Sequence, residues 1–212
     1  MFLEPLVKNS ALFFGMSEEK LKQTLTQMRA HKKEYKKGEC LCREGGEMPF
    51  FGLVLCGAVQ AFTDDINGDR VLMTSVDAGG TFGESLCFLG VKEIPVCIYA
   101  ATDCAVLWLS CEHLKSGADT ELYNRFSSML AQRALDMNDR IQVLSKLSVR
   151  DKLMTLFSQY AHKNGSRTFS LPFDRESLAS YIGANRSALS RELSNMQKEG
   201  IIEFYKNSFK IL

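Results

Sequence analysis

The side chains whose types and spacing point most directly to chemistry lie near the C-terminus, in the segment FDRESLASYIGANRSALSRELSNMQKEGII. If a helix begins after Asn185, residues four positions apart share one of its faces. Two arginines and two serines then project together from its first two turns, namely Arg186, Ser187, Ser190 and Arg191. Arginine can donate two hydrogen bonds to O6 and N7 of guanine, and serine can contact bases or phosphates. This spacing predicts a helix that reads base edges in the major groove of duplex DNA.

The residues before this helix predict the first half of a helix-turn-helix. A shorter helix would bury Leu178, Ala179 and Ile182, and the turn between the two helices falls at Gly183-Ala184-Asn185. Glycine permits such a tight turn, and the side chain of Asn185 can accept a hydrogen bond from a free backbone amide of the second helix.

The residues after the turn predict a buried face and a wing. The second helix has an apolar stripe made of Leu189, Leu193 and Met196, and Gly200 ends it. The following IIEF and SFKIL predict two strands joined by a turn, with Lys206 and Lys210 available to phosphates. A winged helix used for protein contacts, with its basic side chains merely solvated, is the alternative.

Charge is unevenly distributed along the chain. The formal net charge of the whole sequence is only +1. Residues 1–146 hold 16 Lys and Arg against 19 Asp and Glu, whereas residues 147–212 hold 10 against 6, a net charge of +4. A basic C-terminal segment favours a localised phosphate-binding surface.

The elements that must position this segment begin with a glycine-punctuated region. Short apolar runs separated by glycines fill residues 37–109, and Asn67-Gly68 lies between two of them as a hairpin turn. Short strands at this spacing predict a small barrel or jelly roll. A helix over residues 17–28, with Ser17 as its N-cap, precedes them. Together with the C-terminal helices, this pattern predicts an α+β fold.

A long helix is expected between the two regions. Apolar residues recur at steps of four and three after Gly117, and they are Leu130, Ala134, Met137, Ile141 and Leu144. This is the period of a coiled-coil seam, which predicts that two copies of the chain pair along this helix. A single helix packed on its own domain also shows such a stripe. The expected domains are residues 1–117, a dimerisation helix over 118–146, and a DNA-binding domain over 147–212.

The sequence indicates a cytoplasmic protein with no membrane partner. The N-terminal MFLEPLVKNSALFFG lacks a basic region ahead of a long apolar core, and no later stretch approaches the roughly 18 apolar residues of a membrane span. The seven cysteines are odd in number, and several lie in apolar runs where a reduced thiol behaves as a small hydrophobe.

No metal site or cofactor is expected. His31, His113 and His162 are scattered along the chain. Residues 1–39 contain no cysteine, and Cys40-x-Cys42 has the wrong spacing for an iron–sulfur cluster or a zinc hairpin.

Two further functions, a redox switch and an enzyme, would each depend on particular residues. Cys40 and Cys42 stand at the start of a strand with both thiols toward one face, so a redox switch at this pair stays open. Paired carboxylates, a Ser-His-Asp arrangement and a phosphate-binding glycine loop are missing from the sequence, so an enzyme is not expected.

The chain resembles the family of the cyclic-AMP receptor protein and FNR, the Crp/Fnr transcription regulators. The resemblance covers nearly the whole chain and follows the order KKGE, REGG, CGAVQAF, NGDR, GGTFGES, a long helix and ASYIGANRSALSREL. It implies a cyclic-nucleotide-binding-type β-roll (a double-stranded β-helix or jelly roll), a dimerising helix and a winged helix-turn-helix. It also implies base reading by Arg186, Ser187 and Arg191, and in some members by the residue at Ser190. Ser187 stands where a glutamate is common, so the half-site can differ from the best-known ones.

The resemblance is weakest where an effector would bind in the roll. Gly83 and Glu84 match the family's glycine-glutamate pair, whose glutamate holds a ribose hydroxyl. Ile94 and Pro95 replace the arginine-serine pair that grips the cyclic phosphate, and a buried phosphate without arginine lacks its charge-assisted partner. The adenine-contacting helix positions are also changed, to Met137 and Asn138. We therefore expect an effector other than cyclic AMP, in a more apolar pocket that also includes Ser85, Leu86 and Val96.

The partners that follow are double-stranded DNA, a second copy of the chain, RNA polymerase and an unidentified small-molecule effector. Four alternatives stay open on the sequence alone. They are a roll filled by its own side chains, a cyclic-nucleotide-responsive regulator, a thiol-sensing regulator, and a ligand-binding signalling module without DNA binding.

Overall fold

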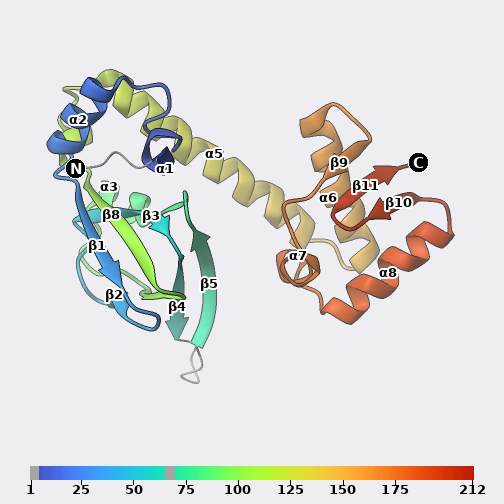
Figure 1. The fold of residues 1–212 in the computed structure, drawn as a ribbon. Coiled ribbons are helices and arrows are strands. Elements are labelled where there is room, and N and C mark those ends of the chain that lie inside the picture. Colours follow the sequence, from blue (N-terminus) through green and yellow to red (C-terminus); the bar gives the residue numbers. More distant parts are fainter. Residues whose placement is uncertain (1–4, 65–69) are drawn as a thin grey trace. The chain divides into compact units, whose positions relative to one another are not determined.

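A computed structural model describes residues 5–64 and 70–212 and shows an α+β protein (Figure 1). The chain divides into two compact units, Met1–Leu130 and Ala131–Leu212. The hairpin turn predicted at Asn67-Gly68 lies outside the described residues. Among the described helices, none is long and apolar enough to cross a membrane.

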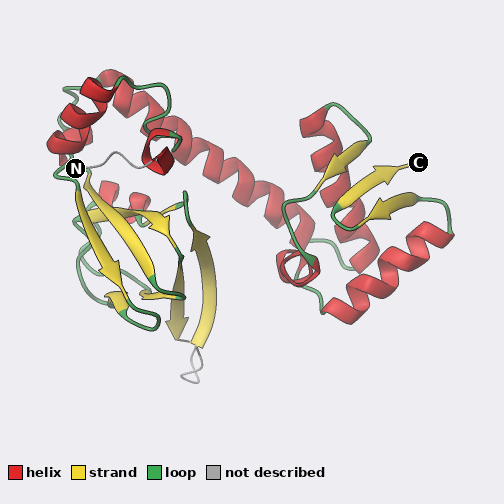
Figure 2. Ribbon diagram, in the orientation of Figure 1, coloured by secondary structure: helices red, strands yellow, loops and turns green. Residues whose placement is uncertain are grey.

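Two antiparallel four-stranded sheets form the roll of the N-terminal unit (Figure 2). The first has the order β1 (His31–Tyr35), β8 (Cys104–Ser110), β3 (Phe50–Cys56) and β6 (Thr81–Phe82). The second has the order β2 (Cys40–Cys42), β7 (Cys97–Ala100), β4 (Ala58–Asp64) and β5 (Arg70–Asp77). The predicted jelly-roll architecture is thereby confirmed.

The roll has two hydrophobic cores because side chains alternate along its strands. Val106 and Trp108 of β8 face an inner core between the two sheets. That inner core consists of Tyr35, Met48, Val54, Val59, Ala61, Phe82, Ile94, Ile98, Ala100, Cys104, Val106 and Trp108. The alternate residues of the same strand, Leu107 and Leu109, belong to an outer core beneath the helices. All seven residues of β8 are therefore buried.

Helices cover the outer core. They are α1 (Pro5–Lys8), α2 (Glu18–Gln27), α3 (Glu84–Leu89), α4 (Glu112–Lys115) and the start of α5 (Thr120–Leu144). The predicted N-cap of α2 is confirmed, since the Ser17 hydroxyl accepts from the amide of Lys20 at 3.2 Å. Leu21 and Leu25 of α2 pack with Phe126 of α5 in this core.

The long helix α5 has 25 residues, as the apolar period predicted. Leu122 and Phe126 are buried in the outer core, and Leu130 packs partly against it. The later stripe residues are exposed instead: Ala134, Met137, Ile141 and Leu144. Val143, outside the stripe, is buried in the core of the C-terminal unit.

The C-terminal unit is a helix-turn-helix with a small sheet. Its elements are the end of α5, α6 (Val149–Asn164), β9 (Thr168–Ser170), α7 (Arg175–Ile182), α8 (Arg186–Lys198), β10 (Ile202–Tyr205) and β11 (Ser208–Ile211). The three strands pair antiparallel in the order β10, β11, β9. Phe157 of α6 stacks near Phe169 and Phe209 of this sheet, with ring centroids 5.7 and 4.8 Å away. The helix-turn-helix and its wing are thus built on one aromatic core.

Candidate nucleic-acid interface

The turn between α7 and α8 is fixed by backbone chemistry at two residues. Gly183 ends α7 in the left-handed region with φ of 61°, a conformation that side chains with a Cβ rarely adopt. The Asn185 side chain then accepts from the amide of Ala188 at 2.8 Å and caps α8. Both predicted roles are confirmed, and together they determine where the recognition helix starts.

The buried stripe of α8 turns its other face outward. Leu189, Leu193 and Met196 are fully buried in the core of the C-terminal unit, as predicted. The four polar side chains at the start of the helix are all exposed: Arg186, Ser187, Ser190 and Arg191. These four residues are called the recognition surface below. They offer two guanidinium groups and two hydroxyls from a single helix face.

The members of the recognition surface differ in the ion pairs and hydrogen bonds that they make within the protein. Arg186 lies 3.3 Å from the carboxylate of Glu176, measured from Nη1 to Oε2, and both side chains are largely exposed. The Ser187 hydroxyl donates to the capping oxygen of Asn185 at 2.9 Å. Arg191 makes no ion pair with any residue that the structure describes. The guanidinium of Arg191 is therefore the freer of the two.

The wing has one lysine exposed at its tip and a second lysine that forms an ion pair across the two strands. Lys206 is exposed in the turn between β10 and β11, with φ of 51°. Lys210 is directly opposite Glu203 across the two strands, and its Nζ lies 3.3 Å from the Glu203 carboxylate. Of the two lysines predicted to face phosphates, Lys206 is thus the one without a paired carboxylate among the described residues.

A groove of about 410 Å³ joins the wing tip to the starts of α7 and α8. Its walls are Asp174, Arg175, Glu176, Arg186, Lys206 and Asn207. Three of these side chains are basic and two are acidic, so the groove has a small net positive charge between α8 and the wing.

Sequence reasoning missed Arg175 in this groove. Its guanidinium lies over the rings of Phe204 and Phe209, at 5.0 and 5.6 Å from their centroids. Burial lowers the pKa of Arg175 from its ordinary value, because the packing removes water from the charged group. A basic residue directly after the capping Asp174 was the available signal, but its packing beneath the wing depends on contacts distant in sequence.

Arg150 of α6 forms ion pairs with the C-terminal half of α8, away from the recognition surface. Its guanidinium donates to both carboxylate oxygens of Glu199 at 2.7 and 2.8 Å, and to Glu192 at 2.6 Å. These acceptors hold the pKa of Arg150 above its ordinary value, with Glu199 contributing most. The network links α6 to the C-terminal half of α8, so it sets the direction in which the recognition surface points.

The roll gathers only some of the predicted effector residues. Ile94 is buried in the inner core, where Leu86 and Val96 also pack, whereas Ser85 and Pro95 are exposed. Met137 and Asn138 are exposed on α5, within the second compact unit. The three residues that lie together in the inner core, Leu86, Ile94 and Val96, are all apolar.

Glu84 is the only acid among the predicted effector residues, and it is buried. Its carboxylate accepts from the hydroxyl of Thr81 at 2.7 Å. Gly83 before it has φ of 75°, and a Cβ at this glycine would come within 2.0 Å of the Met48 side chain. The backbone conformation therefore favours glycine here, and any larger residue would also have to displace the end of the Met48 side chain.

The comparisons with known proteins place both halves of the chain. Residues 149–212 match the Crp-like helix-turn-helix domain, and residues 32–120 match the cyclic nucleotide-binding domain. The chain belongs to the Crp/Fnr family of transcription regulators. The resemblance read from the sequence, and the fold it implied, are confirmed.

Individual relatives of this Crp/Fnr regulator are distant in sequence. Electron transport regulator A of Shewanella oneidensis is 23% identical over 178 residues, which cover 81% of this chain and 71% of that protein. The fumarate and nitrate reduction regulatory protein of Yersinia pestis is 23% identical over 195 residues, covering 89% and 77%. The catabolite activator protein structure from Thermus thermophilus is 20% identical, with a TM-score of 0.54 and coverage of 96% and 94%. The structural likeness shows a shared fold.

The Cys40 and Cys42 pair of this Crp/Fnr regulator lies in β2, at the strand start predicted for it. A β-bulge falls between the two residues, and the Cys40 thiol donates to the Cys42 carbonyl at 3.4 Å. Cys42 packs partly against the inner core, and burial raises the pKa of its thiol to about 11. A thiol with so high a pKa is a poor nucleophile near neutral pH.

The histidines and acids of this regulator are also dispersed in space. Among residues 5–64 and 70–212, no three His, Cys, Asp or Glu side chains gather closely enough to hold a metal ion.

Proposed function

We propose that this Crp/Fnr regulator binds a pseudo-palindromic DNA site as a homodimer, with α8 of each subunit in the major groove. The observation that carries the proposal is the recognition surface itself, whose two arginines and two serines are all exposed at the capped end of α8. Arg186 and Arg191 would donate to guanine edges, and Ser187 and Ser190 to bases or nearby phosphates. Lys206 at the wing tip and Arg175 beside it would contact the phosphate backbone.

The dimer is proposed to form along α5. The stripe leaves large apolar side chains uncovered in one chain, with Met137 66% and Ile141 60% exposed. Leu144 is also 41% exposed, and Ala134 completes the run. Two copies of the helix can bury these stripes against each other, because both have the same apolar spacing. Two recognition helices would then enter successive major grooves about 34 Å apart.

We keep three functional segments in this proposal, residues 1–117 for effector binding, 118–146 for dimerisation and 147–212 for DNA binding. The connection at residues 145–148 leads from α5 into α6, whose first turn is capped by the Ser148 hydroxyl. An effector that binds two conformations of the roll unequally would change the geometry of this connection and so the DNA affinity. RNA polymerase is the further partner expected of a regulator bound at a promoter.

The effector is proposed to be an uncharged or weakly charged organic molecule. Ile94 occupies the position that grips a cyclic phosphate in nucleotide-binding relatives, and it is 1% exposed in an apolar core. A phosphate placed there would lose its water without gaining a cationic partner, which is strongly unfavourable.

The DNA-binding proposal is tested by selecting bound sequences from random duplexes with the full-length protein. We expect the selected sites to contain two inverted half-sites, and sedimentation to show a dimer on each site. Selection of no sequence above background would instead favour a signalling module that does not bind DNA. A single half-site bound by a monomer would contradict the dimer while leaving DNA binding intact.

The effector proposal is tested by thermal unfolding with saturating cyclic AMP or cyclic GMP. A ligand at 100 times its dissociation constant adds about 2.7 kcal/mol to the free energy of unfolding. We expect neither nucleotide to move the midpoint. A rise of a few degrees would show that Ile94 and Pro95 still permit a phosphate site, and the regulator would respond to a cyclic nucleotide.

A further inference from the structure

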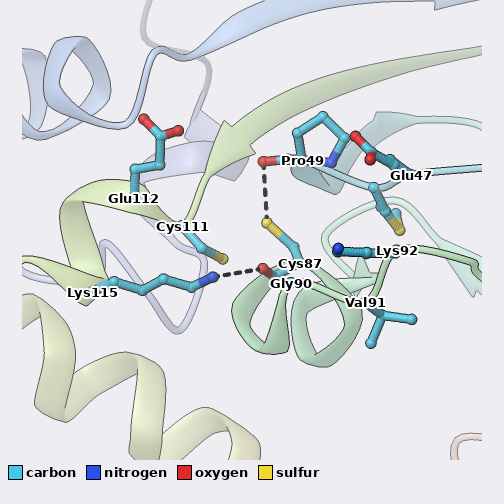
Figure 3. Close-up of a pocket in the computed structure, with 10 residues that line it drawn as sticks. Glu47, Pro49, Cys87, Gly90, Val91, Lys92, Cys111, Glu112 and Lys115 are labelled. Atoms are coloured by element: carbon cyan, nitrogen blue, oxygen red, sulfur yellow. Dashed lines mark hydrogen bonds between the residues drawn. The ribbon is translucent and has the colours of Figure 1, made fainter.

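A cavity of the N-terminal unit, of about 280 Å³, brings two cysteines together (Figure 3). Cys87 comes from α3, and Cys111 follows β8 at the start of α4. Both are almost fully buried, at 4% and 2% exposed, yet both line the cavity. Glu47, Pro49, Lys92 and Lys115 are among the other lining residues. None of these residues belongs to the recognition surface or to the proposed effector site.

The two thiols line the same cavity and have unequal surroundings. The Cys87 thiol donates to the carbonyl of Pro49 at 3.3 Å, and Lys115 donates from Nζ to the carbonyl of Cys87 at 3.3 Å. The side chains of Cys87, Cys111 and Lys115 point toward one another (Figure 3). The hydrogen bond from Cys111 lowers the pKa of Cys87 from its ordinary value, with a smaller contribution from the Lys115 charge. The same bond raises the pKa of Cys111.

We propose that Cys87 and Cys111 form a dithiol that small hydroperoxides oxidise to an intramolecular disulfide. Cys87 is the attacking thiolate, and Cys111 is the resolving thiol. The two residues line one cavity, and the Cys87 sulfur lies 3.3 Å from the carbonyl oxygen of Pro49. Pro49 precedes Phe50, which pairs with Ser110 directly before Cys111, so the strand pairing holds the two cysteines in the same region. A local side-chain movement would bring the sulfurs to the roughly 2.05 Å of a disulfide. The cavity is large enough to admit a peroxide beside Cys87.

The chemistry balances over two steps. The Cys87 thiolate attacks the terminal oxygen of the hydroperoxide, so an S–O bond forms and the O–O bond breaks. The departing alkoxide, or hydroxide from hydrogen peroxide, takes up the proton lost by Cys87. The Cys111 sulfur then attacks the sulfenic sulfur, an S–S bond forms, and hydroxide leaves with the Cys111 proton as water. The two thiols lose two electrons, which reduce the peroxide to water and an alcohol or a second water.

Three of the other thiols, Cys42, Cys104 and Cys56, are less suited to this reaction. Burial raises the pKa of Cys42 and of Cys104, which lowers their thiolate fraction. Cys56 is exposed, but the structure shows it in no thiol hydrogen bond among the described residues. The Cys87 and Cys111 pair combines a favoured thiolate and a second thiol in the same cavity.

The disulfide would restrain α3 at a point where it contacts α5. Phe88, next to Cys87, has its ring 5.2 Å from that of Phe126 and 6.3 Å from that of Tyr123. Any effect of this restraint on DNA affinity rests on the proposed function. The test therefore measures thiol chemistry directly, so that the dithiol and the DNA-binding proposal can fail separately.

The experiment exposes the reduced full-length protein to a slight excess of hydrogen peroxide and maps its thiols by peptide mass spectrometry. We expect loss of two free thiols of the seven and one cross-linked peptide pair containing Cys87 and Cys111. Cys56→Ser is the matched control and should form the same cross-link. Absence of the cross-link, or oxidation of the other cysteines at the same rate, would overturn the proposal.

Two variants separate the roles of the pair. In Cys111→Ser the sulfenic acid of Cys87 has no resolving thiol and should be trapped by dimedone, whereas Cys87→Ser should give no adduct at Cys111. Lys115→Met leaves both thiols in place and should slow oxidation of Cys87 about threefold, because the thiolate loses a nearby cation. Equal oxidation rates in Lys115→Met and the parent protein, both folded by circular dichroism, would refute the electrostatic part of the assignment.

Discussion

Replacing Arg191 with alanine removes a guanidinium from the C-terminal end of the recognition surface without breaking an ion pair to any described residue. Arg191 is exposed and makes no ion pair with any described residue, so the free energy of unfolding should change by no more than about 0.5 kcal/mol. A lost bidentate contact to a base costs about 1–3 kcal/mol, or about 5- to 150-fold in affinity for each half-site. Arg191→Ala should therefore produce a folded protein that has lost specific DNA binding.

Lys198→Ala is the matched control for this change. Lys198 is also exposed and lies on the same helix, seven residues nearer its C-terminus. At 1.5 Å per residue it stands about 10 Å farther along the helix axis. It removes the same charge from α8 outside the end that enters the groove. We expect its affinity for the selected site to stay within about threefold of the parent protein.

The assay is fluorescence anisotropy with the selected duplex and a scrambled duplex, at several salt concentrations. A base contact by Arg191 predicts a large loss on the selected duplex and a small loss on the scrambled one. A phosphate contact would instead weaken both duplexes equally and reduce the salt slope by about one. If Arg191→Ala bound the selected duplex as tightly as Lys198→Ala, α8 would not be the recognition helix and the reasoning from its exposed face would be wrong.

The remaining predictions concern the dimer, the cap and the β2 cysteines. Ile141→Glu should give a folded monomer in sedimentation equilibrium, because it places a charge in the seam, while Gln142→Glu, one residue away, should remain dimeric; a dimeric Ile141→Glu would contradict the seam. Asn185→Ala should lower the free energy of unfolding of the C-terminal unit by about 0.5–2 kcal/mol in chemical denaturation, and an unchanged value would deny the cap its role. Cys42, with a pKa of about 11, should be only about one part in a thousand thiolate at pH 8, so its alkylation should accelerate tenfold per pH unit up to that pKa. A rate that levels off below pH 9 would show that its thiol is not buried as described.

Local chemistry made the C-terminal unit predictable. The cap at Asn185, the left-handed turn at Gly183 and the apolar stripe of α8 each depend on a few neighbouring residues, and each has the role predicted for it. The long helix α5 was also predictable, since its apolar period continues over many turns. Signals of this kind need no information about distant parts of the chain.

The features that were not predictable depend on residues far apart in sequence. Arg150 reaches Glu192 and Glu199 across 42 and 49 residues, and no local pattern pairs them. The shared cavity of Cys87 and Cys111 likewise requires α3 and the end of β8 to lie together. Such partners become visible only when the strands and helices are packed.

The packing of the roll also shows how an effector in its interior would reach α5. The central strands of the first sheet, β8 and β3, are shared by the two cores, so β3 turns Val54 toward the inner core and Phe51 toward the outer one. The ring of Phe51 lies 5.8 Å from that of Phe126, on the first part of α5. Close-packed interiors resist the entry of new groups, so a ligand wedged beside Val54 must displace β3 rather than compress its neighbours. The displaced strand would carry Phe51 against Phe126, and a ligand that favours one position of β3 would thereby favour one position of the dimerisation helix.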